Sequence, residues 1–186
     1  MQVIITLWAP ILLSAVFVFV VSSIIHMMLP YHKTDFDKAP SEDKVMEALR
    51  KYKIPPGDYS LPCARSTKEM ISAEFKNKRE KGPVAFITVM ENGIPDMRGS
   101  LLQWFLYSIL VGIFSGYLTT HAVAGNSDYL AVFRFSGTVA FAGYGLALLQ
   151  NSIWYKRSWS STFKSMFDGL IYALVTAGTF GWLWPQ

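Results

Sequence analysis

Residues 166–184 read MFDGLIYALVTAGTFGWLW and carry one charged side chain, that of Asp168. Small residues recur in this segment at every fourth position: Gly169, Ala173, Ala177 and Gly181. This spacing places the small side chains on one face of an α-helix. Apolar bulk gives two helices in lipid no reason to associate, so close approach over small residues supplies the packing. We interpret the segment as a transmembrane helix against which other helices pack.

The composition is that of a membrane protein. Of the 186 residues, 52% are hydrophobic and 16% are charged, whereas charged residues usually make up about a quarter of a soluble domain. Thirteen of the 17 Lys and Arg lie at positions 33–98, where 11 of the 13 acidic residues also lie. This balanced mixture does not form the basic face of a nucleic-acid-binding protein. The single cysteine, Cys63, excludes an intramolecular disulfide and a cysteine-based metal site.

Four segments are long and apolar enough to be helices that cross about 30 Å of hydrocarbon, which takes about 20 residues. They are residues 1–25, 101–120, 129–149 and 163–184. A cleaved signal peptide is the alternative for the first, but that segment lacks a basic N-terminal region and a good cleavage site. The predicted fold is an all-α membrane protein with four transmembrane helices and a small α+β domain inserted between the first two.

The insert, residues 26–100, is the polar part of the chain. An amphipathic helix is predicted at residues 42–53 with Ser41 as its N-cap. The sequence Ser66-Thr67-Lys68-Glu69 fits a capping box and opens a second predicted helix. Short strands are expected at residues 59–61 and 84–90. Because about 75 residues bury only a modest core, we expect the insert to lean on the membrane surface or on a partner.

Small residues also mark the second and third spans. Gly112 and Gly116 form a GxxxG pair that we expect to pack against the last helix. Gly137 continues the pattern in the third span. With four spans, every tryptophan falls at a membrane interface, as an aromatic belt requires. These belt residues are Trp8, Trp104, Trp154, Trp159, Trp182 and Trp184.

The distribution of basic residues predicts the orientation. The insert and the loop after the third span lie on one side of a four-span protein and hold 16 of the 17 Lys and Arg. The positive-inside rule therefore places the insert in the cytoplasm and both termini outside. Long loops obey this rule poorly, so Lys156, Arg157 and Lys164 near the short loop carry most of the argument.

Asp168 is the most informative polar residue, because a carboxylate at the membrane edge is costly unless it has a partner. Counting helical turns places it at the level of His26, Gln103 and Asn151, which together form a candidate polar site under the insert. The site would bind a proton, a metal ion or a small solute. We favour the simpler interpretation, in which Asp168 is a first-turn acid satisfied by backbone N–H groups and interfacial water.

The three histidines do not predict a metal site. His26 and His32 are six residues apart in a proline-containing stretch, not at the i,i+4 spacing that places two ligands on one helical face. His121 falls on the opposite side of the membrane. All three are interpreted as interfacial polar residues, and no cofactor is indicated. Catalytic motifs are also lacking, and Cys63 is expected to be unreactive.

Four stretches resemble a family of small, uncharacterised four-helix proteins of the bacterial inner membrane. They are HMMLPYH (26–32), PPGDY (55–59), GPVAF (82–86) and DGLIYALVTAGTFGWLWP (168–185). The resemblance covers most of the chain and implies an inner-membrane location and a four-helix layout. It brings no activity, cofactor or functional residue.

For function, the leading hypothesis is a non-enzymatic accessory or scaffold subunit that packs against a larger membrane complex or another copy of itself in the bilayer. Its basis is that small-residue faces on three spans exceed what one bundle must use, and that the insert is too small to be stable by itself. The alternative is a transporter or binding protein for a small solute or ion, acting through Asp168 and His26. A membrane enzyme of unknown chemistry is third, because no catalytic group of residues is evident.

Overall fold

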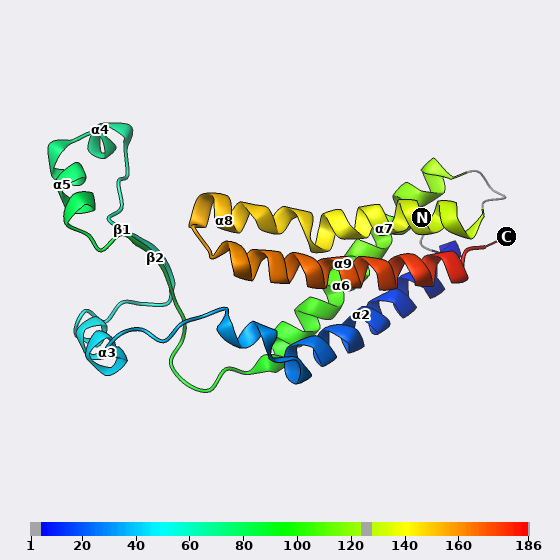
Figure 1. Ribbon diagram of the computed structural model, residues 1–186, viewed down its shortest axis with the longest axis horizontal. Coiled ribbons are helices and arrows are strands. Elements are labelled where there is room, and N and C mark those ends of the chain that lie inside the picture. The colour runs from blue at the N-terminus through cyan, green and yellow to red at the C-terminus, as the bar shows by residue number, and fades with distance from the viewer. Residues whose placement is uncertain (1–4, 124–127, 186) are drawn as a thin grey trace. The chain divides into compact units, whose positions relative to one another are not determined.

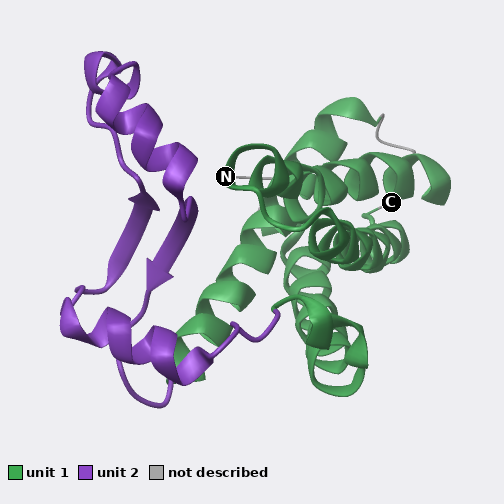
Figure 2. Ribbon diagram, turned by 60° about the vertical axis from the view of Figure 1, so that its left-hand side comes forward, with its two compact units in different colours: residues 1–36, 96–186 green, residues 37–95 purple. Residues whose placement is uncertain are grey.

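The computed structural model describes residues 5–123 and 128–185, which are mostly helical (Figure 1). The long helices are α2 (Trp8–Met28), α6 (Met97–Ala122), α7 (Tyr129–Tyr144) and α9 (Trp159–Trp182). The shorter ones are η1 (Pro30–Thr34), α3 (Glu42–Lys51), α4 (Thr67–Met70), α5 (Ala73–Lys81), η2 (Leu146–Leu148) and α8 (Leu149–Tyr155). Two strands, β1 (Gly57–Leu61) and β2 (Ala85–Val89), form the sheet. The chain divides into unit 1, residues 1–36 and 96–186, and unit 2, residues 37–95 (Figure 2).

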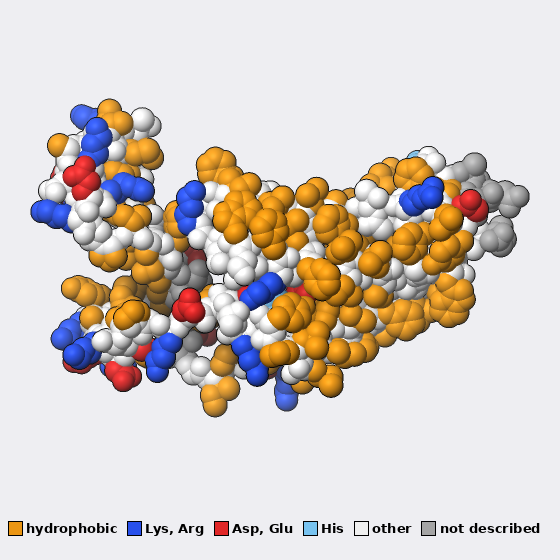
Figure 3. Space-filling model, viewed as in Figure 1, with side chains coloured by type: hydrophobic (Ala, Val, Ile, Leu, Met, Phe, Trp, Pro, Cys, Tyr) orange, Lys and Arg blue, Asp and Glu red, His pale blue; other side chains and the backbone are white. Residues whose placement is uncertain are grey.

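The four long helices of unit 1 form a closed bundle, in which α2 packs on α6, α6 on α7, α7 on α9 and α9 on α2. Its interior is unusually polar, because hydroxyl side chains such as Ser108 and Ser115 are buried. Its exterior is apolar, and Leu110 and Phe114 of the same helix α6 are about half exposed. Figure 3 shows hydrophobic side chains covering these helices along most of their length. A continuous apolar exterior of this kind suits lipid rather than water.

Three stretches of helix are long and apolar enough to cross a membrane: Trp8–Met28, Met97–Ala122 and Tyr129–Tyr155. The chain thus has the makeup of a multi-pass membrane protein. The fourth predicted span, α9, is 24 residues long but does not reach the same hydropathy. Its hydropathy is lower because it contains polar residues such as Thr162, Asp168 and Thr176. Their side chains are buried in the bundle.

The small residues of α9 pack on α7. A Cβ atom placed on Gly169 would come within 2.9 Å of backbone atoms of Tyr144 and Gly145, and one placed on Gly137 would lie 2.9 Å from Ala177 Cβ. Close backbone approach over small residues is the packing mode expected between helices in lipid. The small-residue face read from the sequence is therefore an internal contact of the bundle.

The GxxxG pair of α6 differs from expectation in its partner. Gly112 lies against Ile11 of α2, and Gly116 lies between Leu7 and the Phe180 ring of α9. The face expected to meet the last helix therefore meets chiefly the N-terminal segment that holds Leu7 and Ile11, and the Phe180 ring of α9 contacts it at Gly116. Each small-residue face is used inside the bundle, which removes the excess of such faces as an argument for a partner subunit.

The tryptophans divide into an exposed and a packed set. Trp8, Trp154, Trp159 and Trp182 have between 49% and 70% of their surface exposed. Trp104 instead packs in the bundle, where its Nε1 donates to Ser22 Oγ at 2.9 Å. Trp184 packs against the cluster that contains Phe180.

Unit 2 consists of a two-stranded antiparallel sheet and three short helices, two of which, α4 and α5, lie between the strands in the chain. β1 and β2 pair from Gly57↔Val89 to Leu61↔Ala85. Within this unit, all of which the structure describes, Phe75 is the only buried hydrophobic residue. Such a small core agrees with the expectation from its length.

The helix starts of unit 2 follow the sequence in part. Ser66 accepts a hydrogen bond from Glu69 N at 3.2 Å, as a capping box requires. The predicted second helix is nevertheless split, because Ser72 caps a new helix by accepting from Phe75 N. Ser41 does not cap α3 with its side chain, since its backbone is left-handed with φ 53°. A capping hydroxyl needs an extended backbone at that position, and Ser66 and Ser72 have one.

Candidate functional site

Asp168 is buried in the bundle and bound to the chain that leaves the first span. Helix α9 begins at Trp159 rather than residue 163, so Asp168 lies more than two turns inside it. At that depth it cannot reach the free N–H groups of the first turn, which the simpler interpretation had invoked. Its Oδ1 accepts from the Tyr31 hydroxyl, and its Oδ2 lies 2.7 Å from His32 Nε2. These two bonds explain how a carboxylate that is 3% exposed is stabilised.

The 3₁₀ turn η1 follows α2 in the chain and contacts α9. Helix α2 ends at Met28, and the extended backbone of Leu29 leads into Pro30 at the start of the 3₁₀ turn. Proline suits this position because its fixed φ favours the first turn of a helix and its missing N–H is not needed there. The turn presents Tyr31 and His32 to Asp168, so residues 29–35 belong with the bundle rather than with the insert.

A second contact holds η1 on α9. Lys164, one turn before Asp168 on the same helix, donates its ammonium group to the Tyr31 carbonyl and to Thr34 Oγ1, both at 2.7 Å. The same nitrogen lies 3.3 Å from Asp35 Oδ1. Asp35 Oδ2 in turn lies 2.7 Å from His32 Nδ1. His32 is therefore held between two carboxylates, and Lys164 is placed beside one of them.

The electrostatics of η1 define its donors and acceptors. Burial, and then the hydrogen bond to Asp168, raise the pKa of Tyr31 above its usual value, so its hydroxyl keeps its proton and acts as the donor. Burial also raises the pKa of Asp35, but the hydrogen bonds from His32 and Lys164 outweigh burial and hold that pKa below its usual value. Asp35 is thus a carboxylate and an acceptor at neutral pH.

His26 lies at the same site, although sequence spacing argued against a cluster of histidines. The rings of His26 and His32 are 4.8 Å apart and nearly perpendicular. One nitrogen from each histidine and one oxygen of Asp168 all lie within 4.8 Å of one another. The spacing argument assumed a continuous helix, whereas α2 ends at Met28 and the 3₁₀ turn η1 contacts both α2 and α9, which places the His32 ring beside that of His26. The group of two imidazoles and one carboxylate has the composition of a metal-ligating set.

The other residues of the predicted polar site lie elsewhere. Gln103 is exposed on α6, and Asn151 is half-buried on α8. In the part of the chain that the structure describes, neither side chain hydrogen-bonds Asp168. His121 is exposed on α6, where its ring is 2.8 Å from the Tyr117 carbonyl of its own helix.

Sequence reasoning paired Asp168 with His26 but missed four residues of the network: Tyr31, His32, Asp35 and Lys164. One signal for the first three was available. The stretch YHKTD directly follows a span, and polar residues gathered at a span exit are candidates for satisfying a buried charge. Which charge they would satisfy was not readable, because Asp168 is 137 residues from Tyr31.

The floor of the site is aromatic. The rings of Trp104 and Tyr144 lie 5.6 Å and 5.7 Å from that of Tyr172, which follows Asp168 by one turn. Tyr31 packs on the same cluster. The Tyr172 side chain is buried, and its hydroxyl has no hydrogen-bond partner among the described residues. Buried polar groups are usually hydrogen-bonded, so this hydroxyl is an exception among the polar groups of the site.

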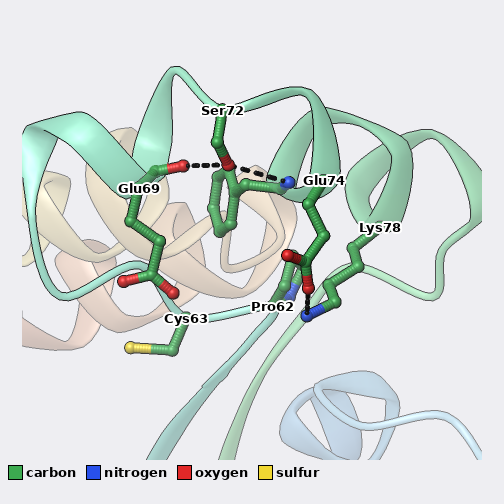
Figure 4. A pocket seen from close by; sticks show the side chains of 7 residues that line it. Pro62, Cys63, Glu69, Ser72, Glu74 and Lys78 are labelled. Carbon is green, nitrogen blue, oxygen red and sulfur yellow. Dashed lines mark hydrogen bonds and ion pairs between the residues drawn. The ribbon is translucent and has the colours of Figure 1, made fainter.

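A separate hollow of about 270 Å³ lies in unit 2, lined by Pro62, Cys63, Glu69, Ser72, Glu74, Phe75 and Lys78 (Figure 4). Its charged groups are already satisfied within the unit. Glu74 forms an ion pair with Lys78 at 2.7 Å, and Glu69 accepts from Arg65 N at 2.8 Å. Cys63 is exposed there. Because its charged side chains already have partners within the unit, this hollow has weaker support as a ligand site than the Asp168 cluster.

Comparison with known proteins adds no relative. No protein-family model, no curated protein and no solved structure matches the chain. The interpretation of the site therefore depends on its geometry alone.

Proposed function

We propose that this chain is a multi-pass membrane protein that binds a small cation at the Asp168 site, as an ion transporter or ion-binding protein does. One observation carries the proposal: Asp168 is 3% exposed inside a helix bundle and is joined to His32, with His26 beside it. Ionisable groups placed inside membrane bundles are costly and mark ion pathways and binding sites more often than they serve stability.

The proposal includes α9 as a fourth span. Its 24 residues match the length of a span, and it packs along both α7 and α2. The buried polar side chains that lower its hydropathy face other helices, where lipid does not reach them. Four spans place the insert and the loop between α8 and α9 on the same side of the membrane.

A panel of cations tests the binding function. We expect one or more of Na⁺, K⁺, Mg²⁺, Ca²⁺ and Zn²⁺ to raise the apparent melting temperature of the purified protein, because a ligand that binds only the folded state stabilises it. In Asp168→Asn, which keeps the side-chain shape, this rise is expected to disappear. Asp128→Asn is the matched control: Asp128 is exposed and asparagine preserves its role as an N-cap. Equal shifts in both variants would contradict the proposal.

We further propose that the protein lies in a bacterial inner membrane with the insert in the cytoplasm and both termini outside. The support for the orientation is the cluster of basic residues Lys156, Arg157 and Lys164 at the short loop, and the support for the location is the resemblance to inner-membrane proteins. Cys63 is the only thiol and is exposed, so a membrane-impermeant maleimide is expected to label it in disrupted cells and not in intact ones. Labelling of Cys63 in intact cells would place the insert outside the cell and contradict the proposed orientation.

An accessory role remains a second candidate, supported by unit 2 rather than by the small-residue faces. Helix α3 has no buried residue, and its apolar side chains Val45 and Leu49 are 43% and 40% exposed. An amphipathic helix with an open apolar face suits a membrane surface or a partner protein. Extraction in a mild detergent tests this role: a larger assembly that Val45→Ser/Leu49→Ser disrupts is expected, and an unassembled chain would rule it out.

A further inference from the structure

We propose that His26, His32 and Asp168 together bind one divalent transition-metal ion of the zinc class. The inference rests on the proposed cation-binding function and names the cation. Its basis is a set of three side chains of the kinds that ligate zinc, drawn from α2, η1 and α9 and gathered at one point.

The distances suit a site that closes on the ion. Zinc bonds of 2.0–2.1 Å in tetrahedral geometry separate neighbouring ligand atoms by about 3.3 Å. His32 Nε2 and Asp168 Oδ2 are 2.7 Å apart, so this pair opens by about half an ångström to admit an ion. The third ligand atom, on His26, lies no more than 4.8 Å from the others. His26 is exposed, and in the described part of the chain it makes no hydrogen bond that would stop its ring from turning inward.

Two of the three ligands have their other polar atom already held. His32 Nδ1 bonds to Asp35 Oδ2 at 2.7 Å, which orients the ring with Nε2 toward Asp168. Asp168 Oδ1 accepts from Tyr31. Zinc-binding histidines characteristically bond a carboxylate through the second ring nitrogen in this way, which fixes the ring and strengthens it as a ligand. Lys164 completes the arrangement by holding Asp35.

The donor atoms determine the class of ion. Two imidazole nitrogens and one carboxylate oxygen suit Zn²⁺, Co²⁺, Ni²⁺ and Fe²⁺, whereas Mg²⁺ and Ca²⁺ require oxygen ligands throughout. Three protein ligands leave one tetrahedral position free for water or for an exchanging ligand, as in sites where the metal is active or mobile rather than structural. The rings of Trp104, Tyr144 and Tyr172 form a cluster on which Tyr31, the hydrogen-bond donor to Asp168, also packs.

Titration with Co²⁺ tests the inference, because Co²⁺ takes zinc's ligands and is coloured when bound. The protein, purified through a tag without histidines and stripped of metal, is expected to bind one Co²⁺ per chain, with visible absorption that Zn²⁺ abolishes. His26→Ala should weaken binding at least tenfold without loss of folded protein, because His26 is exposed and takes no part in the hydrogen-bonded network. Asp35→Asn should weaken it about 10- to 100-fold through His32. His121→Ala, the matched control, should bind Co²⁺ as the unmodified chain does.

The outcomes separate this inference from the function on which it rests. Absence of stoichiometric Co²⁺ binding, or equal binding by His26→Ala and the unmodified chain, would overturn the zinc-class site. If the zinc-class site failed but Na⁺, K⁺, Mg²⁺ or Ca²⁺ stabilised the protein in a manner that depends on Asp168, the cation-binding function would stand. If no cation gave a shift that depends on Asp168, both would fall.

Discussion

Asp168→Ala is expected to lower the free energy of unfolding by about 3 kcal/mol. Removing one member of a buried, hydrogen-bonded group leaves its partners without the acceptor that they bind. The Tyr31 hydroxyl and His32 Nε2 lose the oxygens that they bind. In a chain of this length the loss corresponds to a fall of roughly 6–12 °C in melting temperature. Thermal unfolding in detergent, followed by tryptophan fluorescence, measures it.

Two further variants make this result specific. Asp37→Ala, which removes an exposed carboxylate close to η1 in sequence, should leave the melting temperature nearly unchanged. His32→Ala combined with Asp168→Ala should cost less than the sum of the two single changes, because the residues share one interaction. Additive losses would show that Asp168 stabilises the bundle independently of η1, contrary to the geometry.

Gly169→Ala is expected to cost about 1–3 kcal/mol although it adds a single methyl group. The new Cβ would lie 2.8 Å from Gly145 Cα and 2.9 Å from the carbonyl carbon and oxygen of Tyr144. These are backbone atoms, which cannot rotate away, so α9 and the end of α7 would have to separate. A lower melting temperature, with weaker packing of α7 against α9, should result.

Gly178→Ala is the matched control in the same helix. A Cβ there has the Tyr129 hydroxyl at 3.9 Å and no nearer heavy atom. Alanine also has the better helix propensity, so the melting temperature should stay the same or rise slightly. If both alanine variants behaved alike, the close contact at Gly169 would not be a feature of the folded protein.

Hydropathy was sufficient to identify three of the four long helices. The apolar runs in α2, α6 and α7 are long enough to be recognised without tertiary information, and the four-residue spacing from Gly169 to Gly181 identified the packing face of α9. The partner of that face was not readable, since α6 and α7 both carry glycines. The structure pairs Gly169 with the end of α7 and Gly112 with α2, because shape matching between whole helices decides such choices.

The candidate site likewise divides into a residue that the sequence identified and partners that only the structure identified. The sequence pointed to Asp168 because it is the only charged residue in the apolar segment 166–184. The sequence by itself therefore determined that this protein is a helical membrane protein with one acidic residue near the start of its last apolar segment. Only the tertiary structure decided what satisfies that carboxylate. A 3₁₀ turn that begins at Pro30 packs on α9 and brings Tyr31 and His32 to a residue more than 130 positions away. Contacts at that separation depend on how helices pack, which local periodicity does not encode.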